Sequence, residues 1–165
     1  MKIQIYTDGG FQFASGTIPP QGSYGYVILV NDMVIEGSGL VDWHKQTTQV
    51  AEMYAIFKAL EFFVVNDFPS KDFSLYIHSD SKYCVNTLNE WYAKWSCNGS
   101  VIPKGKENVD LWSKIWDLKK QFFFVKMIWV KGHDGDKWNE RVDDLNQIAL
   151  GRVPKKKVIK QPRRN

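Results

Sequence analysis

Two carboxylates stand where apolar strand-like runs end, which is a common place for chemistry. Asp8 follows the first run and precedes Gly9 and Gly10, and Asp80 follows a later run that ends at His78. Ligands gather outside the carboxyl ends of parallel strands, so both acids could face one site. Simpler explanations exist, because Asp8 could shape a turn with the glycines and Asp80 could cap the following helix.

Two further acids fall on predicted helices. Glu52 lies among apolar residues such as Val50 and Met53, although an acid in the first turn of a helix also complements the helix dipole. Asp143 and Asp144 open the last predicted helix and both point away from its apolar stripe. Periodicity therefore does not choose between them, and an exposed acidic face remains an alternative.

Four carboxylates that converged on one site would repel one another without a partner. Hard oxygen ligands of this kind suit Mg²⁺ or Mn²⁺ and not zinc. A pair of such ions about 4 Å apart is a known device for cleaving phosphodiesters. The combination of acids therefore predicts nuclease chemistry.

The elements that must position these acids can be read from hydrophobic periodicity. Strands are predicted at Lys2–Thr7, Tyr24–Val30, Met33–Val41, Phe73–His78 and Phe122–Val130, and helices at Thr48–Val65, Ser81–Lys94, Val109–Lys120 and Asn139–Leu150. A loop is expected between Gly9 and Ser23. Three leading strands followed by alternating helices and strands predict an α/β fold with a mixed sheet, antiparallel first and parallel later, flanked by helices.

Composition indicates one compact domain of 165 residues, 44% hydrophobic, with no apolar run long enough to span a bilayer. The chain shows no signal-peptide pattern, and Cys84 and Cys97 are expected to be reduced thiols in the cytoplasm. Residues 152–165 hold seven of the 22 Lys and Arg and no acid, which leaves 15 bases against 18 acids in residues 1–151. We expect a domain over residues 1–151 of net charge −3, and a basic tail that either contacts phosphates or is simply solvated.

Six stretches in order resemble one family closely. They are residues 6–10 (YTDGG), Glu52 with Ala55, residues 78–83 (HSDSKY), residues 108–112 (NVDLW), residues 129–135 (WVKGHDG) and residues 139–143 (NERVD). Over residues 3–150 the chain resembles ribonuclease H of type 1, which cuts the RNA strand of RNA/DNA hybrids. The resemblance implies a five-stranded mixed sheet and an endoribonuclease that leaves 5′-phosphate and 3′-hydroxyl ends.

The resemblance also implies roles for particular residues. Two Mg²⁺ ions, replaceable by Mn²⁺, would be bridged by Asp8, with Asp143 completing one and Glu52 and Asp80 holding the other. Asp143 is preferred to Asp144 because it occupies the last place of the Asn-Glu-x-x-Asp pattern. His133, in a glycine-flanked loop, would move protons or help the product leave.

Substrate contacts transfer by position in the same way. The implied contacts are Lys45, Thr47 and Asn108 on a DNA phosphate, Gln49 in the RNA minor groove, and Tyr83 with Trp91 on a deoxyribose, although the last two could be ordinary helix core. Residues 91–107 resemble the protruding handle of bacterial members. The expected partner is an RNA/DNA hybrid bound by a monomer, with no membrane association.

The chain departs from the family pattern at several places. Thr48 stands where many members have Asn, Val50 replaces a common Arg, and the handle offers only Lys94, Lys104 and Lys106. The loop Phe11–Ser23 is longer than typical and is expected to expose Phe11, Phe13 and Ile18. The alternatives are a related nuclease on another duplex or branched nucleic acid, and a non-catalytic hybrid-binding module. A proofreading-type exonuclease is disfavoured, because its first motif needs Asp-x-Glu.

Overall fold

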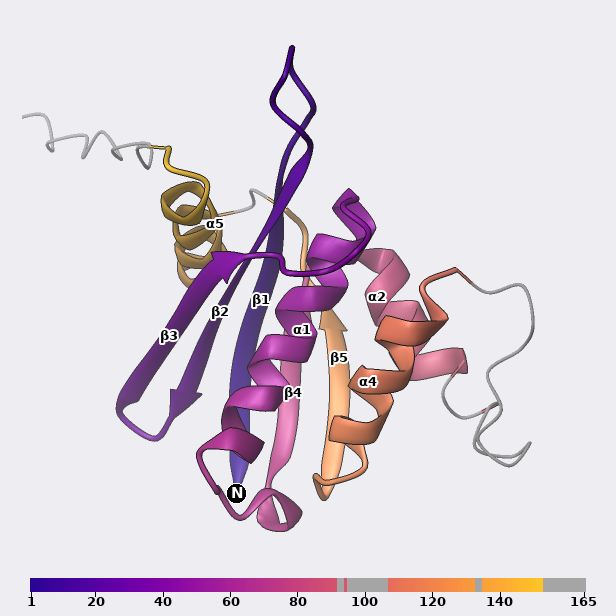
Figure 1. Cartoon of the computed structure of the whole chain (residues 1–165). Coiled ribbons are helices and arrows are strands. Elements are labelled where there is room, and N and C mark those ends of the chain that lie inside the picture. Colours follow the sequence, from indigo (N-terminus) through magenta and orange to yellow (C-terminus); the bar gives the residue numbers. More distant parts are fainter. Residues whose placement is uncertain (92–93, 95–106, 133–134, 153–165) are drawn as a thin grey trace, which may run out of the picture.

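The computed structural model describes residues 1–91, 94, 107–132 and 135–152 (Figure 1). The interior of the predicted handle, the loop residue His133, Cys97 and the tail beyond Arg152 lie outside these residues. Among the helices that are described, none is long and apolar enough to cross a membrane. Cys84 is a buried free thiol.

One mixed sheet of five strands runs through the described residues, in the order β3-β2-β1-β4-β5. Its strands are β1 (Lys2–Gln12), β2 (Gln21–Val30), β3 (Met33–Leu40), β4 (Ser74–Ser79) and β5 (Phe124–Trp129). The pairs β1–β2 and β2–β3 are antiparallel, whereas β1–β4 and β4–β5 are parallel. The predicted fold class is confirmed.

Helices cover both faces of this sheet (Figure 1). They are α1 (Thr48–Val65), α2 (Lys82–Asn86) with the π-helical turn η2 (Thr87–Trp91), α4 (Val109–Lys119), α5 (Lys137–Ala149) and the short 3₁₀ turn η1 (Ser70–Asp72). Successive residues of a strand point to opposite faces. A β-carbon on Gly9 would meet α1 and one on Gly10 would meet Asn146 of α5, so α1 and α5 lie on opposite faces.

The main core lies between the sheet and α1. Ile5 of β1, Ile28 of β2 and Ile77 of β4 are fully buried there, and α1 buries residues around most of its circumference. A smaller cluster of Val27, Val142 and Leu145 holds α5 against the other face. Burying each such aliphatic side chain contributes roughly 1.5–3 kcal/mol, so the strands that carry the acids are firmly seated.

Several predicted boundaries are wrong, most of them at the ends of elements. The region expected as a loop from Gly9 to Ser23 is largely a hairpin, because β1 runs on to Gln12 and pairs with β2 as far as Gln21. Asp8 therefore lies inside β1 and does not end it. The predicted helix Ser81–Lys94 changes to π-helical hydrogen bonding at Thr87. The last helix begins at Lys137 and not at Asn139, because Asp136 caps it.

Candidate active site

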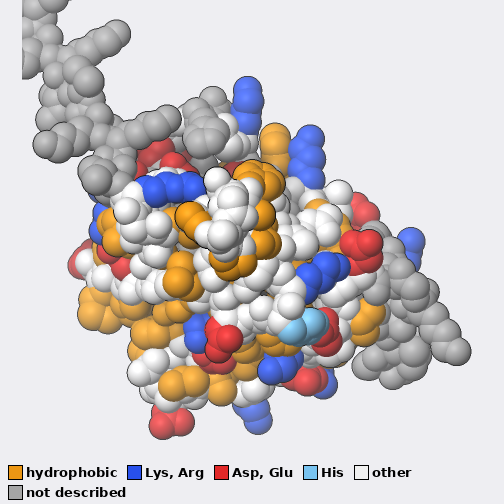
Figure 2. All heavy atoms as spheres, turned by 45° about the horizontal axis from the view of Figure 1, so that its top comes forward, with side chains coloured by type: hydrophobic (Ala, Val, Ile, Leu, Met, Phe, Trp, Pro, Cys, Tyr) orange, Lys and Arg blue, Asp and Glu red, His pale blue; other side chains and the backbone are white. Residues whose placement is uncertain are grey.

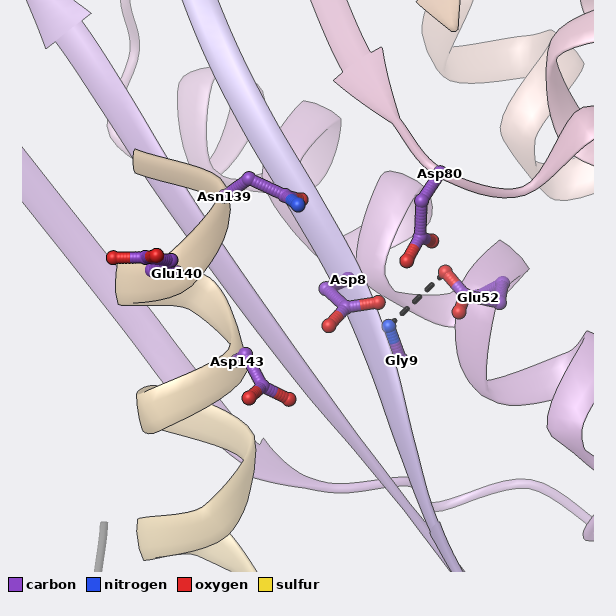
Figure 3. A pocket seen from close by; sticks show the side chains of 7 residues that line it. All are labelled: Asp8, Gly9, Glu52, Asp80, Asn139, Glu140 and Asp143. Carbon is purple, nitrogen blue, oxygen red and sulfur yellow. Dashed lines mark hydrogen bonds between the residues drawn. The ribbon is translucent and has the colours of Figure 1, made fainter. Parts of the chain in front are cut away.

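Three of the predicted acids converge at the upper edge of the sheet (Figure 3). Carboxylate oxygens of Asp8, Glu52 and Asp80 lie within 4.8 Å of one another, although the three residues come from β1, α1 and the end of β4. Asp8 is only 8% exposed and the other two are half-buried. No simple turn or capping role needs three acids so close together.

Strand pairing places Asp8 beside Asp80. The parallel pairing of β1 with β4 ends at Tyr6 and His78, and each acid lies two residues further along its strand. The alternative in which Asp80 caps the next helix is wrong, because Ser81 is the N-cap of α2 and accepts a hydrogen bond from the backbone of Cys84 at 3.2 Å. The Asp80 side chain instead belongs to the cluster with Asp8 and Glu52.

Glu52 reaches the cluster because α1 packs unusually close to β1. The backbone N–H of Gly9 donates to Oε2 of Glu52 at 3.1 Å. A β-carbon on Gly9 would lie 2.4 Å from backbone atoms of Ala51 and Glu52, so this approach requires glycine. Thr47 starts the helix by accepting from the backbone of Val50 at 3.1 Å.

Asp143 lines the same cavity, and Asp144 does not. The cavity measures about 200 Å³, and the Asp143 side chain points from α5 toward Asp8, whereas Glu140, which also lines the cavity, points away from the cluster (Figure 3). Asp144 instead lines a separate hollow beside Arg141. Because α5 begins at Lys137, Asp143 sits in its second turn and does not open the helix. Among these two acids, which helical periodicity does not separate, the packing of α5 thus brings Asp143 to the cavity of the three converging acids.

Burial and mutual repulsion raise the pKa of both buried carboxyls. The pKa of Asp8 is well above its usual value, first because the group is buried and next because of the charge of Asp80. Burial is also the main cause of the raised pKa of Glu52, followed by the charge of Asp8. A positive partner would relieve both effects.

The lining of this cavity fits divalent cations. Its described lining residues are Asp8, Gly9, Glu52, Asp80, Asn139, Glu140 and Asp143, and none of them is basic. Oxygen ligands are what Mg²⁺ and Mn²⁺ prefer. Asn139 and Glu140 also line the cavity, and both belong to the motif at residues 139–143, but they were not predicted as site residues. Asn139 lies one helical turn before Asp143, and this spacing indicates that the two side chains share a face of α5.

A buried amide that the sequence analysis missed ties α5 to the catalytic strand. Nδ2 of Asn146 donates to the backbone carbonyl of Asp8 and to that of Val142, both at 3.0 Å, and its Oδ1 accepts from the Ser23 hydroxyl at 2.7 Å. Asn146 is fully buried. The available signal was the position of Asn146 on the inner face of α5, beside the apolar residues Val142 and Leu145.

The residues expected to hold a DNA phosphate come from segments that meet. Nε2 of His44 lies 3.1 Å from a carboxylate oxygen of Asp110, a contact that joins the segment of Lys45 and Thr47 to the start of α4. Asn108 precedes α4 with a left-handed backbone (φ 59°), and its buried Nδ2 has no hydrogen-bond partner among the described residues. Thr47 also serves as a helix cap, as described above.

The other predicted contacts are less defined. Gln49 is exposed in the first turn of α1. The Tyr83 hydroxyl accepts a hydrogen bond from Trp112 at 3.1 Å, so this ring is partly helix packing. The backbone of Trp91 ends η2, and its side chain lies outside the described residues, as does His133. Gly132, next to His133, lies against Asp80: a β-carbon there would be 3.2 Å from Oδ2.

Comparisons with known proteins agree in pointing to one family. The family model described as RNase H matches residues 1–150. Ribonuclease H of Ruthia magnifica is 33% identical over 92% of this chain and 97% of its own length. Among solved structures, LC9-RNase H1, a type 1 RNase H with the type 2 active-site motif, matches with a TM-score of 0.70, 20% identity and coverage of 91% of this chain and 72% of that one.

A second solved structure, LC11-RNase H1 in complex with an RNA/DNA hybrid, matches with a TM-score of 0.63 and 22% identity, covering 90% of this chain and 99% of that one. The sheet order and these likenesses define the class, an α/β domain of the ribonuclease H-like fold. The curated sequence relatives narrow the class to a family. The chain belongs to the ribonuclease H family and is a ribonuclease H enzyme.

Proposed function

We propose that this enzyme hydrolyses the RNA strand of RNA/DNA hybrids with two divalent ions, Mg²⁺ or in its place Mn²⁺, and leaves 5′-phosphate and 3′-hydroxyl ends. The observation that carries the proposal is the convergence of Asp8, Glu52 and Asp80, with Asp143 lining the same cavity. The hybrid in the complex of LC11-RNase H1, a protein of the same fold, supports the choice of substrate.

Asp8 lies between the other acids and would bridge the two ions. Asp143 would complete one ion from α5, and Glu52 and Asp80 would hold the other from the α1 side (Figure 3). Bound there, the ions would lower the pKa of the attacking water and stabilise the charge that develops on the leaving oxygen. The protein itself contributes fixed geometry, because Gly9 holds Glu52 and the Asn146 amide holds the backbone at Asp8.

His133 is proposed as a proton-transfer group that assists turnover. Its neighbour Gly132 lies against Asp80, so the start of this loop borders the carboxylate cluster. Imidazole titrates near neutral pH and suits such a role. Replacement by Ala should slow turnover by about one to three orders of magnitude while metal dependence remains.

Recognition of the DNA strand is proposed for the residues near the start of α4. The buried Nδ2 of Asn108, which has no partner within the described part of the chain, is a donor that a phosphate oxygen would satisfy. Lys45 and Thr47 come from the segment that His44 joins to Asp110. Gln49 is proposed to face the RNA minor groove, where 2′-hydroxyls are displayed. Tyr83 and Trp91 remain proposed contacts for a deoxyribose.

The neighbouring acids of α5 give a matched test of the site. Asp143→Asn should reduce hybrid cleavage in Mg²⁺ by at least about a hundredfold, whereas Asp144→Asn should change it less than about threefold. Cleavage of a labelled hybrid, double-stranded RNA, double-stranded DNA and single-stranded RNA would be compared in Mg²⁺ and in EDTA. A severe loss with Asp144→Asn and a mild one with Asp143→Asn would reverse the assignment, and cleavage in EDTA would overturn the metal-ion mechanism.

A further inference from the structure

The hairpin formed by β1 and β2 extends well beyond the sheet, on the side where the acids lie (Figure 1). The two strands stay paired from Asp8 and Gly25 up to Gln12 and Gln21. Past Gln12, reciprocal backbone hydrogen bonds of 3.0 and 2.9 Å between Ser15 and Ile18 close the tip. The strand that supplies Asp8 therefore continues directly into a built projection, named here the arm (residues 11–21).

The arm is anchored where it leaves the body. Oε1 of Gln46 accepts from the backbone N–H of Gly22 at 2.7 Å, and its Nε2 donates to the carbonyls of Val41 and Trp43 at 2.9 and 3.0 Å. Gly16 takes a positive φ of 58° at the first central position of the tip turn, which glycine adopts without strain. Through Gln46, the base of the arm is fixed to the segment that precedes α1.

The arm carries large apolar side chains that are exposed to solvent instead of buried in a core. Phe13 is 74% exposed and Ile18 is 52% exposed. Phe11, which the sequence analysis expected to be exposed, is half-buried, and its ring meets that of Phe13 edge-on at 5.0 Å. In Figure 2, which looks onto this end of the molecule, hydrophobic side chains gather near the centre, with charged ones around them.

The arm also carries no charge. No Asp, Glu, Lys or Arg occurs in residues 9–31, in a chain of which 24% is charged. An uncharged surface beside an acidic cluster allows the phosphates of a polyanion to approach without further repulsion. Exposed Phe and Ile suit contact with the apolar parts of nucleic acids, where such residues wedge against bases and sugars.

We propose that the arm is a second contact for the RNA/DNA hybrid, in which Phe13 and Ile18 pack against bases or sugars at a distance from the cleaved phosphate. Phe13 lies five residues beyond Asp8, or at most about 17 Å of extended strand, which corresponds to about five base pairs. This inference rests on the proposed hybrid substrate. It adds that affinity depends on hybrid length on one side of the cleavage site.

The test uses the double variant Phe13→Ala/Ile18→Ala. Its matched control is Met33→Ala/Val34→Ala, which removes exposed apolar side chains of 59% and 48% exposure from the other hairpin, at the opposite end of the sheet. Steady-state cleavage would be measured on a hybrid with about ten base pairs on each side of one cleavable ribonucleotide linkage, and on two hybrids shortened to about three base pairs on one side or the other.

The arm variant should raise KM for the long hybrid about fivefold or more, the lower end of base–aromatic stacking, with kcat little changed. On the shortened hybrid that no longer reaches the arm, the unmodified enzyme and the arm variant should have the same KM. The control variant should have the KM of the unmodified enzyme on all three hybrids. Phe13→Leu, which keeps apolar bulk, should recover part of the affinity.

An unchanged KM on the long hybrid would overturn the proposal and leave a protein partner as the occupant of the arm. An equal rise in KM on all three hybrids would also overturn it, because a general loss of folding or binding does not depend on length. If the unmodified enzyme cleaved none of the hybrids, the proposed function would fail instead. The two failures are therefore distinguishable.

Discussion

The negative charges of the carboxylates at the site repel one another in the metal-free protein, and this repulsion lowers the free energy of unfolding. The pKa of Glu52 is raised first by burial and then by the charge of Asp8. A raised pKa in the folded state means that stability is lost as pH rises from the unfolded-state value of about 4.3 through the higher folded-state value. The cluster therefore destabilises the metal-free protein more at neutral pH than at acid pH.

Glu52→Gln should accordingly raise the free energy of unfolding of the metal-free protein at pH 7 by about 1 kcal/mol. The amide keeps an oxygen for the Gly9 N–H but carries no charge. Urea unfolding in EDTA should show the gain shrinking as the pH is lowered toward about 4, where the carboxyl is protonated in both states. The exposed Glu90→Gln serves as the control and should change little. A loss of stability at pH 7 would contradict the repulsion.

Asn146 acts on the site through the backbone, and its effect can be separated from simple stability. Asn146→Ala leaves the buried carbonyl of Asp8 without its donor, which should cost about 1–3 kcal/mol in unfolding. It should also weaken Mn²⁺ binding, measured by calorimetry without substrate, because Asp8 and Asp143 are no longer held in register. KM for the hybrid should change little.

Ser23→Ala is the matched variant, since it removes the hydroxyl that donates to Asn146 but leaves the contact with Asp8 in place. It should lower stability and spare Mn²⁺ affinity. Equal losses of affinity in both variants would show that Asn146 acts only through folding.

Close packing of α1 on β1 is the feature at the scale of elements that the site depends on. The β-carbon of Gly9→Ala would meet backbone atoms at 2.4 Å, and backbone cannot rotate away. We expect destabilisation of about 3 kcal/mol or more, with loss of cleavage, because the strand and helix must separate. A β-carbon on Gly16 meets open space, and only the positive φ of 58° opposes Gly16→Ala, which should therefore lower the free energy of unfolding by about 1 kcal/mol. Thermal unfolding followed by circular dichroism would compare the two, and a mild effect of Gly9→Ala would refute the close contact.

Sequence patterns predict the types of element well and their ends poorly, for identifiable reasons. Helix α1 is predicted with its observed bounds because apolar periodicity and the cap at Thr47 agree. The extension of β1 over residues 9–12 is missed because it begins with two glycines, and only pairing with β2 makes these residues a strand. The start of α5 is missed because the cap at Asp136 precedes the first apolar residue of the stripe.

The acids that line the cavity can be found from the spacing of the motifs, whereas the predicted strand ends mark only Asp80, because β1 continues past Asp8. Convergence on one cavity depends on the order of strands in the sheet, which no local pattern specifies. The choice between Asp143 and Asp144 likewise required either the family pattern or the packing of α5. Periodicity places Asn146 on the inner face of α5, but it does not reveal the partners Asp8 and Ser23, which lie more than a hundred residues away in the sequence.

At the scale of the whole molecule, charge is divided between a mildly acidic body and a basic tail. Residues 1–151 carry 15 bases and 18 acids, whereas residues 152–165 carry seven bases and no acid. A body with an acidic site is a poor long-range attractor for a polyanion. We therefore propose that the tail supplies part of this attraction by contacting phosphates.

Truncation after Gly151 should weaken hybrid binding at low salt and raise KM more than it lowers kcat, because it removes binding that is equal in the ground and transition states. On duplex DNA, each neutralised phosphate adds about 0.9 to the magnitude of the slope of log affinity against log salt. If about half of the seven charges of the tail contact phosphates at once, truncation should reduce the magnitude of this slope by roughly two to four units. A full-length variant with the tail Lys and Arg replaced by Gln should match the truncation, since charge and not length is the cause. Binding titrations between about 50 and 200 mM salt would measure the slopes, and an unchanged slope and KM in both variants would mean that the tail does not contact the substrate.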